Sequence, residues 1–315
     1  MKRFKNILYY ADHDKKDMLE RAFSLAQSNQ AVLTIMDVIE TAEIAEDVIS
    51  LYGIDLNNLL CQQRLKDLEA LIKPYQKENL LIKTKVVIGK PFIELIRKVQ
   101  CDNHDLLMKT AQPQEGLVDR IFGSSDMHIL RKCPCPVWID GAESSRHYKT
   151  ILAAVDPMDD ACEDLNTLIM DLATSLADKE SAQLHIVHAW SLQGESMLQS
   201  PRGGLSKAEL HNLLNSTQLR HSKKLDQLLH KYNLNSNNEK VSLVKSEAAS
   251  AISHKADQIN ADLIVMGTIG RTGIPGLFIG NTAEDVLNST NASVLAVKPQ
   301  GFVSPVSLPK NCKYD

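Results

Sequence analysis

The sequence predicts an α/β protein with two tandem, doubly wound domains, each built on a five-stranded parallel sheet. Three observations support this fold class: a length of 315 residues, an internal repeat, and short apolar runs that alternate with helical patterns. Domains commonly hold roughly 100–150 residues, so the length suggests two of them. Strands that alternate with helices are typical of a parallel sheet with helices on both faces.

The internal repeat is visible in short segments of both halves. KNILYYADHD at 5–14 resembles KTILAAVDPMD at 149–159, and each contains an apolar run that leads to an aspartate, Asp12 or Asp156. In the last third of each half the offset is constant at 157 residues. It pairs Asp105 with Asp262, Gly123 with Gly280, and Val137 with Val294. A long, constant offset indicates two homologous halves.

The domain boundary is expected in the polar run at 140–149, DGAESSRHYK. We assign residues 1–143 to the first domain and 144–299 to the second. The remaining tail, 300–315, carries two prolines and little periodicity, so we expect it to pack loosely or not at all.

In the second half, runs of aliphatic and β-branched residues predict strands, and apolar residues three and four apart predict helices. The predicted strands lie near 149–155, 182–189, 240–245, 261–267 and 292–297. The predicted helices lie near 160–177, 205–232, 248–259 and 281–289. The second helix has one apolar face, formed by Leu210, Leu213, Leu214, Leu225, Leu228 and Leu229.

Composition and charge argue against several classes of function. A net charge of −4 without a long basic run makes nucleic acid an unlikely direct partner. The N-terminal apolar stretch is too short for a secretory signal, and no later stretch is long enough to span a membrane. The six cysteines form no CxxC pair, which favours reduced thiols and a cytoplasmic location.

Five of the fourteen glycines lie within residues 266–284, MGTIGRTGIPGLFIGNTAE. Such a cluster indicates a loop that needs positive φ angles or close contact with a ligand. Ligands of open parallel sheets bind beyond the carboxyl ends of the strands. Asp156 ends the first strand of this half, and Met266 and Gly267 end the fourth. We therefore expect Asp156 and the glycine stretch to flank one crevice.

The glycine stretch leads into a helix. Gly280 precedes it, and Asn281 or Thr282 is expected to cap it. A helix N-terminus presents unpaired N–H groups and about half a positive charge, so it attracts phosphate. Gly267 and Gly270 let the main chain approach that phosphate. We call this arrangement, a strand end plus the first turn of the next helix, the cradle.

Two other phosphate motifs are absent from the sequence. A P-loop needs GxxxxGK, and no lysine lies between 256 and 297; the GxGxxG pattern fails because the chain contains no GxG. Arg271, which follows Gly270, either neutralises phosphate charge or is an exposed loop arginine.

These residues resemble the universal stress protein family, whose nucleotide-binding members carry GxxG, nine residues, and then Gly followed by Ser or Thr. Gly267, Gly270 and Gly280 match this spacing, whereas Asn281 departs from it, although Thr282 comes next. We expect weakened rather than abolished phosphate contact. The resemblance covers nearly the whole chain and is to tandem, two-domain members.

The resemblance implies the strand order 3-2-1-4-5 in each domain and a pseudo-two-fold relation between the domains. It also implies that the motif holds ATP or AMP, with or without Mg²⁺. Asp156 and Ala189, at the end of the second strand, would then approach the adenosine. In the family the last strands of two domains pair, which would join 137–139 to 294–297 within this chain.

The first half departs from the motif, because Thr110 stands opposite Gly267 and Pro113 opposite Gly270. Proline has no N–H to donate, and threonine resists positive φ. We predict that the first half does not hold ATP by the same cradle and is a degenerate structural copy. A different ligand beyond Asp12 is left open.

No metal site is predicted. Cys133 and Cys135 lack zinc-ligand spacing and are expected to be buried as small apolar residues. His185 and His188 lie three residues apart on a predicted strand, so they face opposite sides of the sheet. His188 either lines the crevice or packs beneath it.

The function favoured by these features is that of a cytoplasmic stress-response protein. Its bound adenine nucleotide sets conformation or the choice of an unknown protein partner, with slow or no hydrolysis, since no general base is evident. One alternative is an ATP-hydrolysing enzyme that uses Asp156, Asp159 or His188. Another is a scaffold whose long helices, at 55–77 and 205–232, bind partners. Further self-association is left open.

Overall fold

The computed structural model describes residues 4–12, 16–40, 45–76, 79–112, 122–141, 147–159, 162–199, 204–268, 279–308 and 312. The chain divides into two compact units. Unit 1 comprises residues 1–146 together with 293–315, and unit 2 comprises 147–292. The last strand of the second repeat therefore packs with the first unit.

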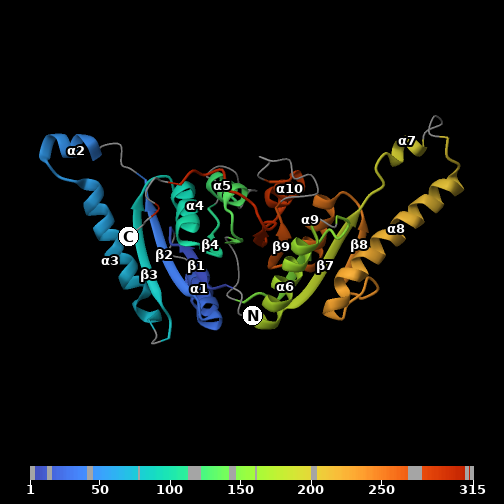
Figure 1. The fold of residues 1–315 in the computed structure, drawn as a ribbon, viewed down its shortest axis with the longest axis horizontal. Helices are drawn as coiled ribbons and strands as arrows, with labels where there is room; N and C mark the ends of the chain where they lie inside the picture. Colours follow the sequence, from blue (N-terminus) through green and yellow to red (C-terminus); the bar gives the residue numbers. More distant parts are fainter. Residues whose placement is uncertain are drawn as a thin grey trace. The chain divides into compact units, whose positions relative to one another are not determined.

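Unit 1 contains a mostly parallel sheet in the order β3-β2-β1-β4-β5-β10 (Figure 1). Its strands are β1 Asn6–Tyr10, β2 Val32–Ile39, β3 Ile82–Ile88, β4 Leu106–Thr110, β5 Val137–Asp140 and β10 Ser293–Val297. Its helices are α1 Lys16–Asn29, α2 Ala45–Tyr52, α3 Leu56–Ile72, η1 Lys73–Tyr75, α4 Pro91–Asp102 and α5 Ser124–Lys132. The first five strands show the order 3-2-1-4-5.

Strand β10 pairs with β5 in the antiparallel direction, with Leu295 opposite Trp138 and Ala296 opposite Val137. This confirms the expected pairing of the last strands of the two repeats. All residues of both strands are buried, so this pairing also extends the core of unit 1.

Unit 2 contains a parallel sheet in the order β9-β6-β7-β8. Its strands are β6 Thr150–Ala154, β7 Gln183–Trp190, β8 Val241–Lys245 and β9 Leu263–Gly267. Its helices are α6 Glu163–Glu180, α7 Glu195–Gln199, α8 Lys207–Leu229, η3 His230–Tyr232, α9 Ala248–Ile259 and α10 Asn281–Ser289. The α/β class and the alternation of elements are as predicted, with α7 as an addition.

The central strands are buried along their length because helices cover both faces. In β4 all five residues are buried, and in β6 the last four are. Near-continuous apolar runs of this kind are what a parallel sheet requires. Lys109 in β4 is the exception, since a charged side chain lies at a fully buried position.

Helix α8 only partly fulfils its predicted apolar face. Its buried residues are Thr217, near the middle of the helix, and His221, Leu225 and Leu229 in its second half. A helix of 23 residues is about 35 Å long, whereas the five-residue strand β8 spans about 17 Å. The first half of α8 therefore extends past the sheet, as Figure 1 shows.

The C-terminal segment departs from two expectations. Cys312 forms a disulfide with Cys101 on α4, so the prediction of reduced thiols is wrong for this pair. The carbonyl oxygens of Val306 and Ser307 each accept a hydrogen bond of 3.2 Å from a side chain of α4. The described part of the tail is thus fastened to α4, where loose packing was expected.

Among the described residues, no helix is both long and apolar enough to cross a membrane.

Candidate functional site

The register of unit 2 aligns three strand ends at one edge of the sheet. Ala154 of β6 lies opposite Val187 of β7 and Met266 of β9. Two residues further along each parallel strand, Asp156, Ala189 and Thr268 therefore reach the same edge. Four predicted site residues, Asp156, Ala189, Met266 and Gly267, are brought together here.

Helix α10 begins at Asn281, and Gly280 is its N-cap residue. The expectation that Asn281 or Thr282 caps the helix is wrong, because both lie inside its first turn. The first bond within the helix runs from the Glu284 N–H to the Gly280 carbonyl oxygen, at 3.0 Å. The N–H groups of Asn281, Thr282 and Ala283 precede that bond, so they have no partner within the helix and are suited to an anion.

Gly280 also fixes the start of α10 to the end of β9. Its N–H donates to the carbonyl oxygen of Thr268 at 2.7 Å. This N–H is therefore engaged within the protein, and the donors left for a phosphate are those of the next three residues.

Gly267 has a packing role. A Cβ atom added at this position would lie 3.0 Å from a methyl carbon of Leu165, so the missing side chain lets α6 approach β9. Its φ is not among the positive values found in the described residues. Gly270 and Arg271 lie outside the described residues, and their roles remain predictions.

The main chain of Asp156 is held by Asn166 on α6. The Asp156 N–H donates to Asn166 Oδ1, and Asn166 Nδ2 donates to the Asp156 carbonyl oxygen, both at 2.8 Å. The Asp156 side chain is 45% exposed. The fixed backbone and accessible carboxylate suit a group that contacts a ligand.

Behind Asp156 lies a pair of buried histidines. His188 Nδ1 is 3.1 Å from the Val155 carbonyl oxygen, and His188 Nε2 is 2.8 Å from His221 Nδ1. A carbonyl oxygen can only accept, so His188 donates through Nδ1, and its Nε2 forms the second hydrogen bond, with His221. His188 is therefore buried and hydrogen-bonded beneath the strand ends. Sequence reasoning missed His221, which lies on the same face of α8 as Thr217 and Leu225.

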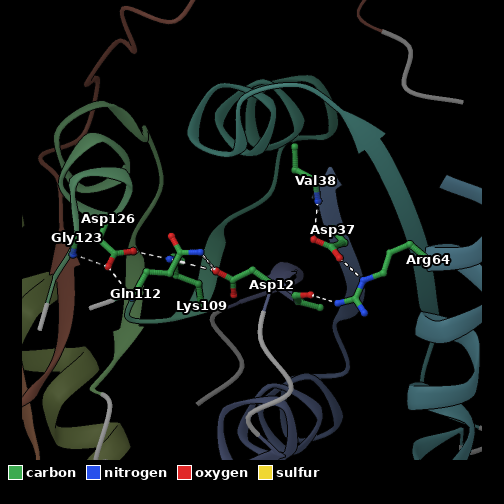
Figure 2. Close-up of polar contacts among 9 residues, drawn as sticks. Asp12, Asp37, Val38, Arg64, Lys109, Gln112, Gly123 and Asp126 are labelled. Atoms are coloured by element: carbon green, nitrogen blue, oxygen red, sulfur yellow. Dashed lines mark hydrogen bonds and ion pairs between the residues drawn. The ribbon is translucent and has the colours of Figure 1, made fainter. Parts of the chain in front are cut away.

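The equivalent region of unit 1 holds a different arrangement (Figure 2). Asp126 Oδ2 accepts hydrogen bonds from the main-chain N–H groups of Gln112, at 2.9 Å, and Gly123, at 3.1 Å. Asp126 Oδ1 pairs with Lys109 Nζ, and both side chains are fully buried. Asp12 Oδ2 lies 3.8 Å from the same ammonium. A carboxylate thus occupies the cradle at the start of α5.

Beside this ion pair, unit 1 has a cavity of about 680 Å³ whose lining includes Tyr10, Asp12, Asp37, Glu40 and Arg64. Arg64 pairs with Asp37 and donates to the Ala11 carbonyl oxygen at 2.9 Å. Burial raises the pKa of Tyr10, and the neighbouring carboxylates raise it further. Such an acidic lining disfavours an anionic ligand.

The cysteine pair considered for metal binding lies in unit 1. Cys133 and Cys135 are buried, and their sulfur atoms are 3.6 Å apart. Within the described ranges, no group of three His, Cys, Asp or Glu side chains is arranged to hold a metal ion.

A family model described as Universal stress protein family matches residues 3–140 and 147–298. Universal stress protein E of Photorhabdus laumondii is 28% identical over 325 residues, which cover 98% of this chain and 100% of that protein. Universal stress protein E of Escherichia coli K12 is 28% identical over 326 residues, with 98% of each covered. Both relatives match the full tandem arrangement.

Solved structures show the same fold. The structure of a functionally unknown protein from Pseudomonas aeruginosa has a TM-score of 0.70 at 24% identity, over 95% of this chain and 94% of that chain. A universal stress protein from Archaeoglobus fulgidus has a TM-score of 0.54 at 17% identity, over 93% and 98%.

Proposed function

Since the chain belongs to the universal stress protein family, we propose that its second repeat binds an adenine nucleotide, ATP or AMP. The bound nucleotide acts as a switch of conformation or partner choice in a cytoplasmic stress response. Hydrolysis is slow or absent.

The observation that carries this function is the convergence at one edge of unit 2. The ends of β6, β7 and β9 are aligned there, and α10 starts beside them because Gly280 is bonded to Thr268. The adenosine would lie against Asp156 and Ala189. The phosphate oxygens would accept hydrogen bonds from the main-chain N–H groups at the start of α10, whose first two residues are Asn281 and Thr282.

The sequence supplies the remaining contacts. The spacing of Gly267, Gly270 and Gly280 is that of the family's nucleotide-binding members, and Arg271 would neutralise part of the phosphate charge. Met266, the residue before the last of β9, is buried and would pack beneath the nucleotide. Any Mg²⁺ would arrive with ATP.

The hydrogen bonds of His188 favour nucleotide binding over nucleotide hydrolysis. Both ring nitrogens of His188 lie within hydrogen-bond distance of protein atoms, Val155 O and His221 Nδ1. His188 is therefore engaged and cannot easily serve as a general base. Asp156 remains as the candidate for the enzyme alternative, which predicts steady multiple turnover that is lost in Asp156→Ala.

The experiment is a search for bound nucleotide, followed by titration. Protein purified without added nucleotide is denatured, and the released small molecules are identified by mass spectrometry. The stripped chain is then titrated calorimetrically with ATP and with AMP. We expect an adenine nucleotide in the first measurement and a single site per chain in the second. A protein that carries none and gives no binding heat would favour the scaffold alternative.

A further inference from the structure

Unit 1 contains an internal anion at the start of α5, the helix that the offset of 157 residues aligns with α10. We propose that Asp126 is the residue that closes the first unit to phosphate-bearing ligands. Its carboxylate occupies the anion position itself and is held there by Lys109 and two main-chain N–H groups. This inference does not depend on the nucleotide site proposed for the second repeat.

Three donors from different segments converge on this one carboxylate, as Figure 2 shows. Lys109 Nζ comes from β4, the Gln112 N–H follows that strand, and the Gly123 N–H belongs to the N-cap of α5. A cation, main-chain amides and a helix N-terminus are the groups that proteins use to hold phosphate. In unit 1 the Lys109 ammonium and the two N–H groups of Gln112 and Gly123 are all engaged by the protein's own side chain.

The closeness of two main-chain segments places these amides together. A Cβ atom at Gly123 would overlap the carbonyl oxygen of Gln112, so only glycine permits this approach. Gly123 is the one glycine of the motif that the first repeat retains. Its N–H donates a hydrogen bond to the Asp126 carboxylate.

The second repeat lacks the pair. The offset of 157 residues places Ala283 at the position of Asp126 and Met266 at that of Lys109. Alanine offers no carboxylate, and methionine offers no charge. The start of α10 therefore has no equivalent internal anion at these two positions.

A simpler role for Asp126 would be helix capping. An acidic residue at the third helical position commonly accepts the N–H of the N-cap residue, and this accounts for the bond to Gly123. Capping accounts neither for the Gln112 N–H nor for a lysine with no exposed surface. A buried ammonium needs a compensating anion, and Asp126 supplies it.

If Asp126 is a substitute for phosphate, its removal should turn the cradle into an anion site. Asp126→Ala leaves the Lys109 ammonium and two N–H groups facing the vacated position, with Asp12 at 3.8 Å as a further partner of the lysine. Inorganic phosphate is the probe. The chain has two tryptophans, Trp138 in unit 1 and Trp190 in unit 2, so a Trp190→Phe parent lets Trp138 fluorescence report on unit 1 alone.

The measurement compares the melting temperature in sodium phosphate with that in sodium chloride of equal ionic strength, in the full-length chain. The parent chain gives the rise in melting temperature that phosphate causes without a new site. In Asp126→Ala we expect phosphate to raise the melting temperature by about 3–5 °C more than in the parent, as for a ligand at roughly ten times its Kd. A gain no larger than the parent's would overturn the inference and leave Asp126 as a capping residue.

A matched control and a second variant complete the test. Asp102→Ala also removes a carboxylate paired to a lysine in unit 1, Lys98 at 2.8 Å, but outside the cradle. It should behave like the parent, and a phosphate-induced rise in melting temperature equal to that of Asp126→Ala would also overturn the inference.

If Asp126→Ala does not fold, the double variant Lys109→Met/Asp126→Ala replaces it. This variant keeps the N–H groups without the cation, and it should show a smaller gain that still exceeds the parent's. No excess gain would count against the inference.

Discussion

Lys109 on β4 and Asp126 on α5 form an ion pair in which neither side chain is exposed to solvent. The pair lies in the first repeat, where the nucleotide motif has degenerated, and its counterparts in the second repeat are Met266 and Ala283. This buried pair is therefore present in the first repeat and absent from the equivalent positions of the second.

The two residues of this pair should stabilise unit 1 together rather than independently. Lys109→Met or Asp126→Ala alone leaves an uncompensated buried charge, so each should lower the free energy of unfolding of unit 1 by about 3 kcal/mol. The double variant removes both charges but also the acceptor of two main-chain N–H groups, so its loss should be clearly smaller than the sum of the two single losses. Urea unfolding in chloride buffer, followed by Trp138 fluorescence in the Trp190→Phe chain, checks this. Additive losses would show that the two residues act independently.

Placing an internal anion in the second cradle should abolish nucleotide binding. Ala283 is the third residue of α10 and is 3% exposed. In Ala283→Asp the new carboxylate would accept hydrogen bonds from the N–H groups at the helix start and would repel phosphate. The affinity for ATP should therefore fall by about a hundredfold or more. Ala283→Asn has nearly the same shape without the charge and should lose less. Calorimetric titration measures both, and equal losses would mean that steric crowding, not charge, is responsible.

The disulfide between Cys101 and Cys312 should stabilise unit 1. The bond spans 211 residues of sequence and fastens the C-terminal segment to α4. Reduction, or Cys312→Ser, should lower the free energy of unfolding by about 2–5 kcal/mol. Cys61→Ser, at a free cysteine, is the control. Urea unfolding with and without reductant provides the comparison.

The same cysteine pair also tests the proposed location. Reducing compartments keep thiols free. Rapid alkylation in intact cells, followed by mass spectrometry, should therefore find Cys101 and Cys312 modified if the protein is cytoplasmic. Resistance to alkylation until reductant is added would argue for an oxidising compartment.

Acid should weaken unit 1 through His104. This side chain is 4% exposed, and burial lowers its pKa from 6.5 to about 4. Between those values the unfolded chain binds a proton that the folded chain does not, so stability falls as the pH drops from 6.5 toward 4. The full effect is about 3 kcal/mol.

Unfolding free energies measured across this window should show a shallower slope in His104→Gln than in the parent. An unaltered slope in His104→Gln would show that other groups cause the acid sensitivity.

The strands and most helices could be predicted from the sequence because their patterns are local. The predicted helices at 248–259 and 281–289 coincide with α9 and α10, and the predicted strands of the second half agree with β6 to β10 within about two residues. Helix α7, Glu195–Gln199, has too few residues to show a period. Contacts between distant segments leave no local pattern, and the disulfide partner of Cys101 is one of these.

The candidate site was predictable where it depends on strand ends and glycine spacing, as for Asp156 and Gly280. The internal anion of unit 1 was missed, although two signals were present. Lys109 follows three apolar residues in strand β4, and a buried lysine needs a partner. Asp126 follows Gly123 by three residues, the spacing of a capping pattern. Only the fold shows that these two residues meet.

The most direct test is a crystal structure of the full-length chain soaked with ATP. We expect nucleotide density at the start of α10, with phosphate oxygens near the N–H groups of Asn281 and Thr282, and none in the crevice of unit 1, where Asp126 still contacts Lys109. Density only in the crevice of unit 1, or in neither crevice, would contradict the assignment of the nucleotide to the second repeat.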